Sequence, residues 1–307
     1  MELYDLIIIG NGPAGLSAAI YGKRAGMKVL VISGNPAGGG QILDTYEVDN
    51  YPGLPGLSGA ELGDVMYKHA EKLGTEFKTD TIKSIEEDGD IKVIKSRRNE
   101  YRTKAVIVAT GAGHRKLGAP GEAEFTGMGV SYCATCDGAF YKDKTVAVVG
   151  GGDVALEDAI YLADIAEKVY LIHRRDEFRG TEVLQDEVKS KANIEIVYDT
   201  VVEEIVGTDK IEKVLIYNKK TDAKSELAVD GVFLAVGITP NTTKIQGLPE
   251  TDEAGYIKAG EDCVTSIPGI FAAGDVRTKM LRQVITAAAD GANALTSVKR
   301  YISGLKA

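Results

Sequence analysis

The sequence predicts an α/β fold built from two Rossmann-like dinucleotide-binding domains, one of them inserted into the other. An apolar strand runs into a glycine turn at "YDLIIIGNGPAG" (4–15), and again at "KTVAVVGGGDVA" (144–155). Each turn is followed by a helical pattern and a second apolar strand, "KVLVIS" (28–33) and "KVYLIH" (168–173). One GxGxxG is a weak signal, but two of them inside strand–helix–strand units of about 30 residues indicate two dinucleotide sites.

The small residues of the two turns are expected to act alike. The first glycine permits the tight turn, the second lets the backbone approach a pyrophosphate, and the third small residue lets helix and strand pack closely. The helix N-terminus then faces the negative charge. The predicted cofactor contacts are Gly10, Gly12, Pro13, Ala14 and Gly15 in the first turn, and Gly150, Gly152, Asp153 and Ala155 in the second.

The order of the segments predicts that the second domain interrupts the first. Each unit later meets a strand that ends in a small-residue turn, "AVIVATG" (105–111) and "GVFLAVG" (231–237). "ITPNTTK" then resembles a linker, and the tail adds "IPGIFAAGDV" (267–276) and a helical pattern from about residue 282. We expect the first domain at 1–113 and 243–307, with the second domain at 114–242.

The second unit carries basic residues where the fingerprint expects an acid. An acidic residue about 20 positions after the turn normally binds the ribose hydroxyls, but "HRRDEFR" here supplies His173, Arg174, Arg175 and Arg179. A guanidinium binds phosphate bidentately and stays charged, so the pattern suits a 2′-phosphate and favours NADPH over NADH. The alternative is a solvated basic helix start.

The first unit has Ser33 at the equivalent position, followed by the glycine-dense "GNPAGGGQ" (34–41). The backbone of such a loop can wrap closely around a nucleotide. "DNYPG" (49–53) and the Gly274–Asp275 turn add polar groups suited to the ribityl chain and ring edge of a flavin. This domain is therefore the predicted flavin site.

"SYCATCDGAF" (131–140) holds two of the three cysteines, with Asp137 directly after Cys136. Three explanations compete: a structural disulfide, half of a metal site, or a redox pair. A metal would need two more ligands, but Cys263 is isolated and the three histidines lack ligand spacing, so we expect no metal. A structural disulfide across this gap would gain little unfolded-state entropy. A redox pair fits best, with Cys133 and Cys136 cycling near a helix N-terminus.

Asp137 lies where it can exchange the proton released or taken up by the dithiol. Cys263 is expected to be a buried small hydrophobic residue without a role.

Over nearly its whole length the chain resembles the low-molecular-weight, bacterial-type thioredoxin reductases. The matching segments are "GNGPAG", "GGGQ", "YPG", "ATG", "CATCDG", "GGGDVALEDAIYL", "HRRDEFR", "AVGITPN", "SIPGIFAAGDV" and "RQVITAAADG". "CATCDG" together with "HRRDEFR" is highly specific. The resemblance implies an FAD flavoprotein that passes electrons from NADPH, through flavin and dithiol, to thioredoxin, and it implies a homodimer.

The resemblance also implies roles by position. Cys133 and Cys136 would be the redox pair, with Cys136 facing the flavin, Cys133 attacking the partner's disulfide, and Asp137 acting as acid/base. NADPH would be bound by Gly150, Gly152, Asp153, Ala155, His173, Arg174, Arg175 and Arg179. FAD would be bound by Gly10, Gly12, Pro13, Ala14, Gly15, Ser33, Gly34, Gly40, Gln41, Asn50, Thr110, Gly111, Gly274, Asp275, Arg282 and Gln283. The chain departs from the family at Ser33, which lacks the fingerprint's carboxylate, and at Gly38–Gly40, which has one glycine more than the commonest "GGQ".

Composition excludes several other classes. The 307 residues carry 36 Lys and Arg against 45 Asp and Glu, a net charge of −9 with a pI near 5.1, which argues against broad nucleic-acid or anionic-membrane binding. No apolar run approaches the roughly 20 residues of a membrane span. "MELYDLIIIG" enters a strand without a basic n-region, so we expect a cytoplasmic protein.

Two other functions stay open at this point. A ferredoxin-dependent flavin thioredoxin reductase of similar fold would be expected to lose the Gly150 fingerprint and the arginines, which this chain keeps. A nucleotide-binding redox sensor would need no acid beside the second cysteine.

Overall fold

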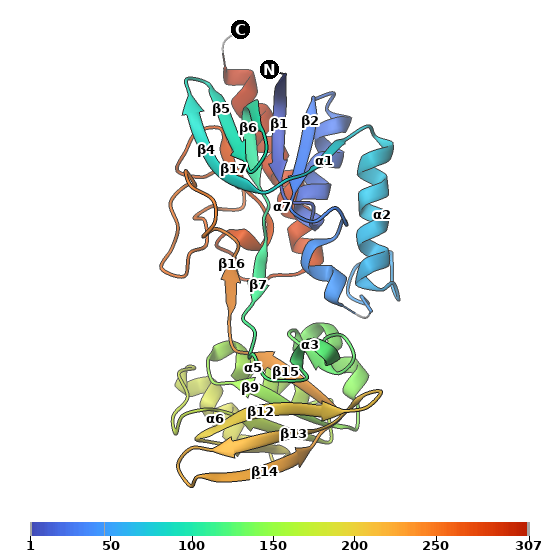
Figure 1. The fold of residues 1–307 in the computed structure, drawn as a ribbon, viewed down its shortest axis with the longest axis vertical. Helices are drawn as coiled ribbons and strands as arrows, with labels where there is room; N and C mark the ends of the chain where they lie inside the picture. Colours follow the sequence, from blue (N-terminus) through green and yellow to red (C-terminus); the bar gives the residue numbers. More distant parts are fainter. Residues whose placement is uncertain (1, 46, 306–307) are drawn as a thin grey trace. The chain divides into compact units, whose positions relative to one another are not determined.

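The structure, a computed structural model, describes residues 2–45 and 47–305. The chain forms two compact units, residues 1–113 with 239–307 and residues 114–238. It crosses between them through β7 (Ala112–His114) and β16 (Ile238–Pro240), which pair as a two-stranded sheet (Figure 1). Beyond β16, the N–H of Asn241 donates to the carbonyl oxygen of Gly111 at 3.0 Å, within the first unit.

The first unit is built on a seven-stranded sheet in which β3, β2, β1, β6 and β17 are parallel and a β4–β5 hairpin extends β6 antiparallel. The helices are α1 (Pro13–Arg24), α2 (Gly59–Lys72) and α7 (Val284–Gly304), with short turns η1 (Gly40–Asp44) and η3 (Gly274–Val276). The strands are β1 (Leu3–Ile9), β2 (Val29–Ser33), β3 (Glu76–Thr79), β4 (Ile82–Asp88), β5 (Ile91–Ser96), β6 (Glu100–Val108) and β17 (Ile270–Ala272).

Both faces of this sheet are buried, which explains the unbroken apolar run in β1. Leu6 and Ile8 belong to the core on the α1 and α7 side, while Ile7 and Ile9 belong to the core on the other side. Parallel strands covered on both faces have no polar face to alternate with. The sheet therefore places the ends of β1, β2 and β6 at one edge, where ligands of such folds bind.

Helix α1 is held at that edge by close packing on α7. A Cβ at Gly291 of α7 would lie 2.2 Å from the carbonyl oxygen of Ala14, so only glycine allows the two backbones to approach this closely. Pro13 stands at the start of α1, where its missing N–H costs no hydrogen bond.

The second unit has a five-stranded parallel sheet in the order β11-β10-β9-β15-β8 and a three-stranded antiparallel sheet in the order β12-β13-β14. Its helices and turn are α3 (Glu122–Phe125), α4 (Ala134–Asp137), η2 (Gly138–Tyr141), α5 (Asp153–Ala163) and α6 (Glu182–Ser190). Its strands are β8 (Val130–Ser131), β9 (Thr145–Gly150), β10 (Lys168–Ile172), β11 (Ile194–Val197), β12 (Thr200–Gly207), β13 (Ile211–Asn218), β14 (Ala223–Ala228) and β15 (Gly231–Ala235).

The second unit therefore has three layers: helices, the parallel sheet and the antiparallel sheet. Val148 of β9 packs with Leu156 of α5 on one face of the parallel sheet, and Val149 packs with Val214 of β13 on the other face. The predicted fold class is confirmed, since each unit holds a parallel sheet with a strand–glycine–helix turn. Within the described residues, no helix is long and apolar enough to cross a bilayer.

Candidate functional site

The first glycine turn joins β1 to α1 with the predicted close contacts. Gly10 has a φ of +113°, and a Cβ there would lie 2.2 Å from the carbonyl oxygen of Ala109. A Cβ at Gly15 would lie 2.0 Å from the carbonyl oxygen of Gly10. At Gly12 the nearest atom to a Cβ would be the Gly39 oxygen at 3.8 Å. Backbone atoms therefore pack tightly against Gly10 and Gly15, whereas space is left at Gly12, next to the first turn of α1.

That opening suits a phosphate. Helix α1 has no side-chain cap and no acidic residue in its first turn, so its first N–H groups are available to an anion. Gly40 of the glycine-dense loop approaches the same turn, because its Cβ would lie 3.3 Å from the Cα of Gly12. Two glycine-rich segments thus line one space at the edge of the sheet.

Ser33, the residue in place of the usual acid, is bonded to the turn. Its hydroxyl donates to Oδ1 of Asn11 at 2.9 Å, and the Asn11 amide donates to the carbonyl oxygens of Asn35 and Ala37 at 2.8 and 2.9 Å. Asn11 is 4% exposed. This side chain, which the sequence reasoning passed over, fixes the start of the 34–41 loop. The position of Asn11 inside a glycine turn could have predicted this role, because an Asn side chain readily forms hydrogen bonds with nearby backbone groups.

Four buried polar atoms in the first unit have no hydrogen-bond partner among the described residues: Oγ1 of Thr75, Oγ1 of Thr110, Oδ1 of Asp275 and Nε of Arg282. All except Thr75 belong to predicted flavin residues. A Cβ at Gly274 (φ +78°) would lie 2.8 Å from Cβ of Ala14, so the Asp275 turn adjoins α1. Burial raises the pKa of Asp275, while Lys279 and Arg282 oppose this rise. Unpartnered oxygens beside an open helix start fit a hydroxyl- and phosphate-rich group such as FAD.

The other predicted flavin residues lie in the same unit. Asn50 donates to Oε1 of Gln283 at 3.0 Å, so these two are brought together. Arg282 places its guanidinium 4.2 Å from the ring centre of Tyr256, and its buried Nε lacks a hydrogen-bond partner in the described chain. Gln41 lies in η1, Gly34 follows β2, and Gly111 follows β6.

A buried ion cluster anchors the Asp275 turn. Asp290 of α7 accepts the N–H of Gly274 at 2.9 Å, two bonds from Arg277 at 2.9 and 2.7 Å, and one from Lys279 at 2.9 Å. The three charged side chains are 3–5% exposed. Burial alone would raise the pKa of Asp290, but the Arg277 and Lys279 bonds outweigh it and lower the pKa. Sequence reasoning missed Asp290, although a charge within "AAADGANAL" was a usable signal.

The second glycine turn repeats the arrangement between β9 and α5. A Cβ at Gly150 would lie 2.5 Å from Cβ of Ala155, and a Cβ at Gly152 would meet no atom within 4 Å. Helix α5 has no side-chain cap, and the carboxylate of Asp153 accepts the Thr181 N–H at 2.8 Å. Unlike α1, α5 has an acid in its first turn, but that carboxylate is bonded to Thr181, so the helix start still fits a second pyrophosphate.

The basic loop is tied to this turn. The N–H of Arg179 donates to the Gly151 oxygen at 2.7 Å, and a Cβ at Gly151 would overlap the His173 ring at 2.2 Å. His173 is buried, its Nε2 is 3.0 Å from the Glu177 oxygen, and burial lowers its pKa. The lowered pKa favours the neutral ring, and the ring packs against the turn.

The three guanidinium groups of Arg174, Arg175 and Arg179 are exposed. Among the described residues none of them forms an ion pair. Such groups are available to a phosphate ligand, and the residues present therefore fit NADPH.

The redox pair is a disulfide. Cys133 and Cys136 are bonded with a Cα–Cα distance of 5.3 Å, at the start of the one-turn helix α4. Asp137 ends that helix, and its buried Oδ1 has no hydrogen-bond partner among the described residues. Burial raises the pKa of Asp137, and a hydrogen bond from Ser131 opposes the rise. An acid of this kind beside a disulfide can give or take a proton.

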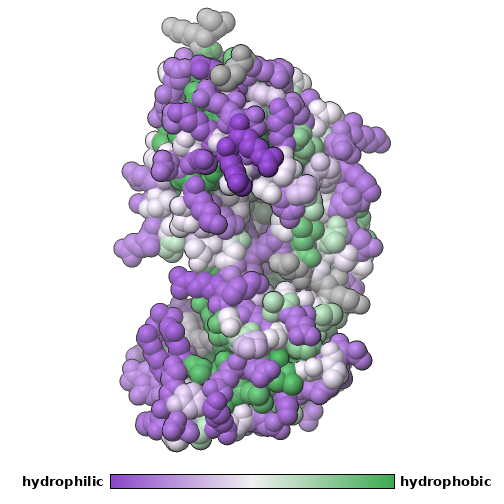
Figure 2. All heavy atoms as spheres, viewed as in Figure 1, coloured by the Kyte–Doolittle hydropathy of each residue, from purple (hydrophilic) through white to green (hydrophobic). Residues whose placement is uncertain are grey.

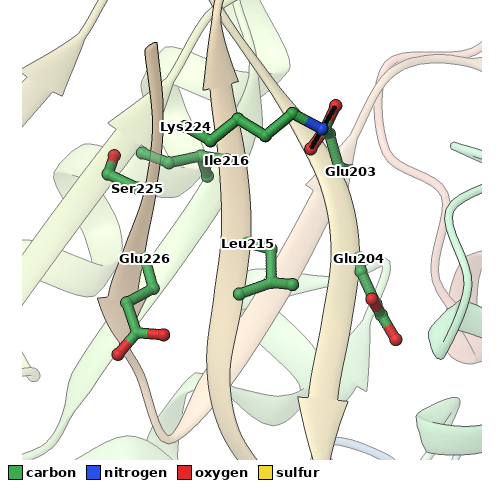
Figure 3. Close-up of a pocket in the computed structure, with 7 residues that line it drawn as sticks. All are labelled: Glu203, Glu204, Leu215, Ile216, Lys224, Ser225 and Glu226. Atoms are coloured by element: carbon green, nitrogen blue, oxygen red, sulfur yellow. Dashed lines mark hydrogen bonds and ion pairs between the residues drawn. The ribbon is translucent and has the colours of Figure 1, made fainter.

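Two further features have no predicted role, and the first of them, Cys263, lies against the ion cluster, with its Sγ 3.5 Å from the carbonyl oxygen of Asp290. Cys263 is fully buried, and burial raises the pKa of its thiol to about 12. A shallow hollow on the outer face of β12–β14 holds Leu215 between charged side chains, with Lys224 paired to Glu203 (Figure 3). Hydrophobic residues bordered by hydrophilic ones show on the visible face of this unit (Figure 2). None of the hollow's lining residues is a predicted site residue.

Comparison with known proteins gives one consistent family. The family model described as pyridine nucleotide-disulphide oxidoreductase matches residues 4–291. The thioredoxin reductase of Listeria innocua serovar 6a is 45% identical over 307 residues, covering 99% of this chain and 96% of that one. The crystal structure of thioredoxin reductase from Streptococcus pyogenes MGAS5005 is 46% identical, with a TM-score of 0.94 and 99% of each chain covered.

A ferredoxin-flavin thioredoxin reductase from Clostridium acetobutylicum is also similar, at 34% identity and a TM-score of 0.53 over 99% of each chain. The chain belongs to the pyridine nucleotide-disulphide oxidoreductase family and, within it, to the thioredoxin reductases.

Proposed function

We propose that this enzyme reduces the disulfide of thioredoxin with electrons from NADPH, through FAD and the Cys133–Cys136 pair. Membership of the family implies a flavoprotein disulfide reductase that uses FAD and NADPH. The observation that carries the proposal is the disulfide beside buried Asp137, in the same unit as the Gly150 turn and the exposed arginines.

Each group has a proposed task. The first unit holds FAD with the open start of α1, Asp275 and Thr110, and bound FAD supplies two-electron transfer between nucleotide and disulfide. The second unit holds NADPH with the start of α5, while Arg174, Arg175 and Arg179 bind its 2′-phosphate. Cys136 would exchange electrons with the flavin, Cys133 would attack the thioredoxin disulfide, and Asp137 would exchange the proton.

The test uses the purified FAD-bound protein, whose yellow absorbance reports flavin reduction. We expect NADPH to bleach it rapidly, NADH and reduced ferredoxin to bleach it poorly, and oxidised thioredoxin to restore the colour with release of thiols. If reduced ferredoxin bleaches the flavin faster than NADPH does, NADPH is not the electron donor and this part of the proposal is wrong. If NADPH bleaches the flavin but thioredoxin is not reduced, the proposed reductase activity is wrong and the alternative of a redox sensor is favoured.

We also propose that the protein is a homodimer in the cytoplasm, a reducing compartment suited to a dithiol enzyme. Met280, Leu281 and Ile285 support a dimer, because these apolar side chains of the first unit are 101%, 55% and 43% exposed. Sedimentation equilibrium at micromolar concentration should give twice the 32.7 kDa chain mass, and a monomer would contradict this part of the proposal.

A further inference from the structure

Ser131 links the redox turn to the acid. It ends β8, two residues before Cys133, and is 5% exposed. Its hydroxyl is 2.5 Å from Oδ2 of Asp137, and it accepts the N–H of Cys133 at 3.1 Å. The Cys133 carbonyl oxygen also lies 3.3 Å away, but a hydroxyl has one hydrogen to donate. The shorter contact, to a carboxylate, takes that hydrogen.

The two oxygens of Asp137 therefore differ. Oδ2 accepts the Ser131 hydroxyl, while Oδ1 is buried without a hydrogen-bond partner in the described part of the chain. A buried carboxylate oxygen normally has a partner. Oδ1 is thus the atom that remains for a transferable proton.

We propose that Ser131 is a positioning residue for disulfide reduction: it ties Asp137 through Oδ2 to the backbone of Cys133, so that Oδ1 exchanges the proton with the cysteine pair. The inference rests on the proposed acid role of Asp137. Reduction breaks the S–S bond and takes up two electrons and two protons to give two thiols. The hydride of NADPH supplies both electrons and one proton, and the second proton comes from solvent through Asp137.

Other ionisable groups lie near Asp137, so a pH titration must distinguish their pKa values from that of Asp137. Tyr141 of η2 faces it, but burial raises the pKa of Tyr141 to about 12, so it stays neutral. Helix α5, which packs on α4, carries Glu157 and Asp158. Burial raises the pKa of Asp158 to about 7, so a limb of the pH–rate profile near neutral pH can belong to Asp158.

The sign of the effect follows from the Ser131 bond. Burial raises the pKa of Asp137 and this bond lowers it, so removing the hydroxyl raises the pKa further. In Ser131→Ala the limb of the pH–rate profile that belongs to Asp137 should move to higher pH. The higher pKa keeps Asp137 in its acid form, so the expected loss comes from misplacement of Oδ1. The rate of disulfide reduction should fall about 10-fold on the low-pH plateau, the effect of losing one hydrogen bond.

The experiment follows single turnover of the FAD-bound enzyme with NADPH across pH. Ser131→Thr keeps the hydroxyl and should retain the wild-type profile. A limb of the pH–rate profile that is caused by Asp158 should be missing in Asp158→Asn. The matched control is Ser96→Ala in the first unit, because the Ser96 hydroxyl is likewise 2.5 Å from Oδ2 of Asp80 and accepts the N–H of Asn99 at 2.8 Å. Ser96→Ala should lower the urea midpoint and leave the profile unchanged.

Three results would overturn the inference: a wild-type profile in Ser131→Ala, an alanine-like profile in Ser131→Thr, or an equal shift in Ser96→Ala. Failure of the underlying function gives a different result. If Asp137→Asn keeps the wild-type rate and profile, the proposed acid role is wrong, whatever Ser131 does.

Discussion

Asp290→Asn should destabilise the first unit far more than the loss of an exposed ion pair. The change leaves Lys279, 5% exposed, without its carboxylate, and leaves Arg277, 3% exposed, with the exposed Glu261 at 3.6 Å. Removing one member of a buried ion cluster costs about 3–5 kcal/mol, because the remaining charges are desolvated and unpaired. The Gly274 N–H also loses a charged acceptor, so FAD should dissociate faster.

Urea unfolding followed by far-ultraviolet circular dichroism suits this chain, which has no tryptophan. It should be measured with and without saturating FAD, since bound FAD adds stability. As a control, Asp64→Asn removes a pair whose side chains are 54% and 69% exposed and should change the free energy of unfolding by less than about 1 kcal/mol. An Asp290→Asn effect no larger than that of Asp64→Asn would refute the reasoning.

The pH dependence gives a second check on the same cluster. The folded-state pKa of Asp290 is lowered, so its contribution to stability is present above the unfolded-state pKa. It is lost as pH falls below about 4 toward the folded-state value. Asp290→Asn should lack this part of the acid-induced loss of stability.

Three further predictions concern the nucleotide, the redox pair and the third cysteine. Arg175→Ala should raise the KM for NADPH about 10- to 150-fold and leave that for NADH nearly unchanged; equal losses would mean that the arginine serves the fold. With FAD bound, Cys133→Ser should show a long-wavelength charge-transfer band from the Cys136 thiolate, and Cys136→Ser should not; the opposite pattern would exchange their roles. In the folded, NADPH-reduced enzyme at pH 8, iodoacetamide should modify two cysteines, because the pKa of Cys263 is about 12; rapid labelling of a third would contradict its burial.

Spacing of small and apolar residues was enough to predict the fold class. The two turns require close contacts that even a Cβ would block at Gly10, Gly15 and Gly150, so the sequence must carry glycine at these positions. The strands buried on both faces must be apolar throughout. The antiparallel β12–β14 layer was not predicted, because alternating strands do not say which face of another sheet they will cover.

What the sequence determined by itself is the set of features that local geometry imposes. The "CATC" spacing lets the two cysteines lie 5.3 Å apart across one helical turn, and the glycine turns open two helix starts. Only the tertiary structure decided which polar atoms meet: Asn11 with Ser33, Asp290 with the Gly274 turn, and Ser131 with Asp137. Such bonds depend on placing two side chains within about 3 Å. Periodicity fixes the face on which a residue lies but does not fix its partner across that face.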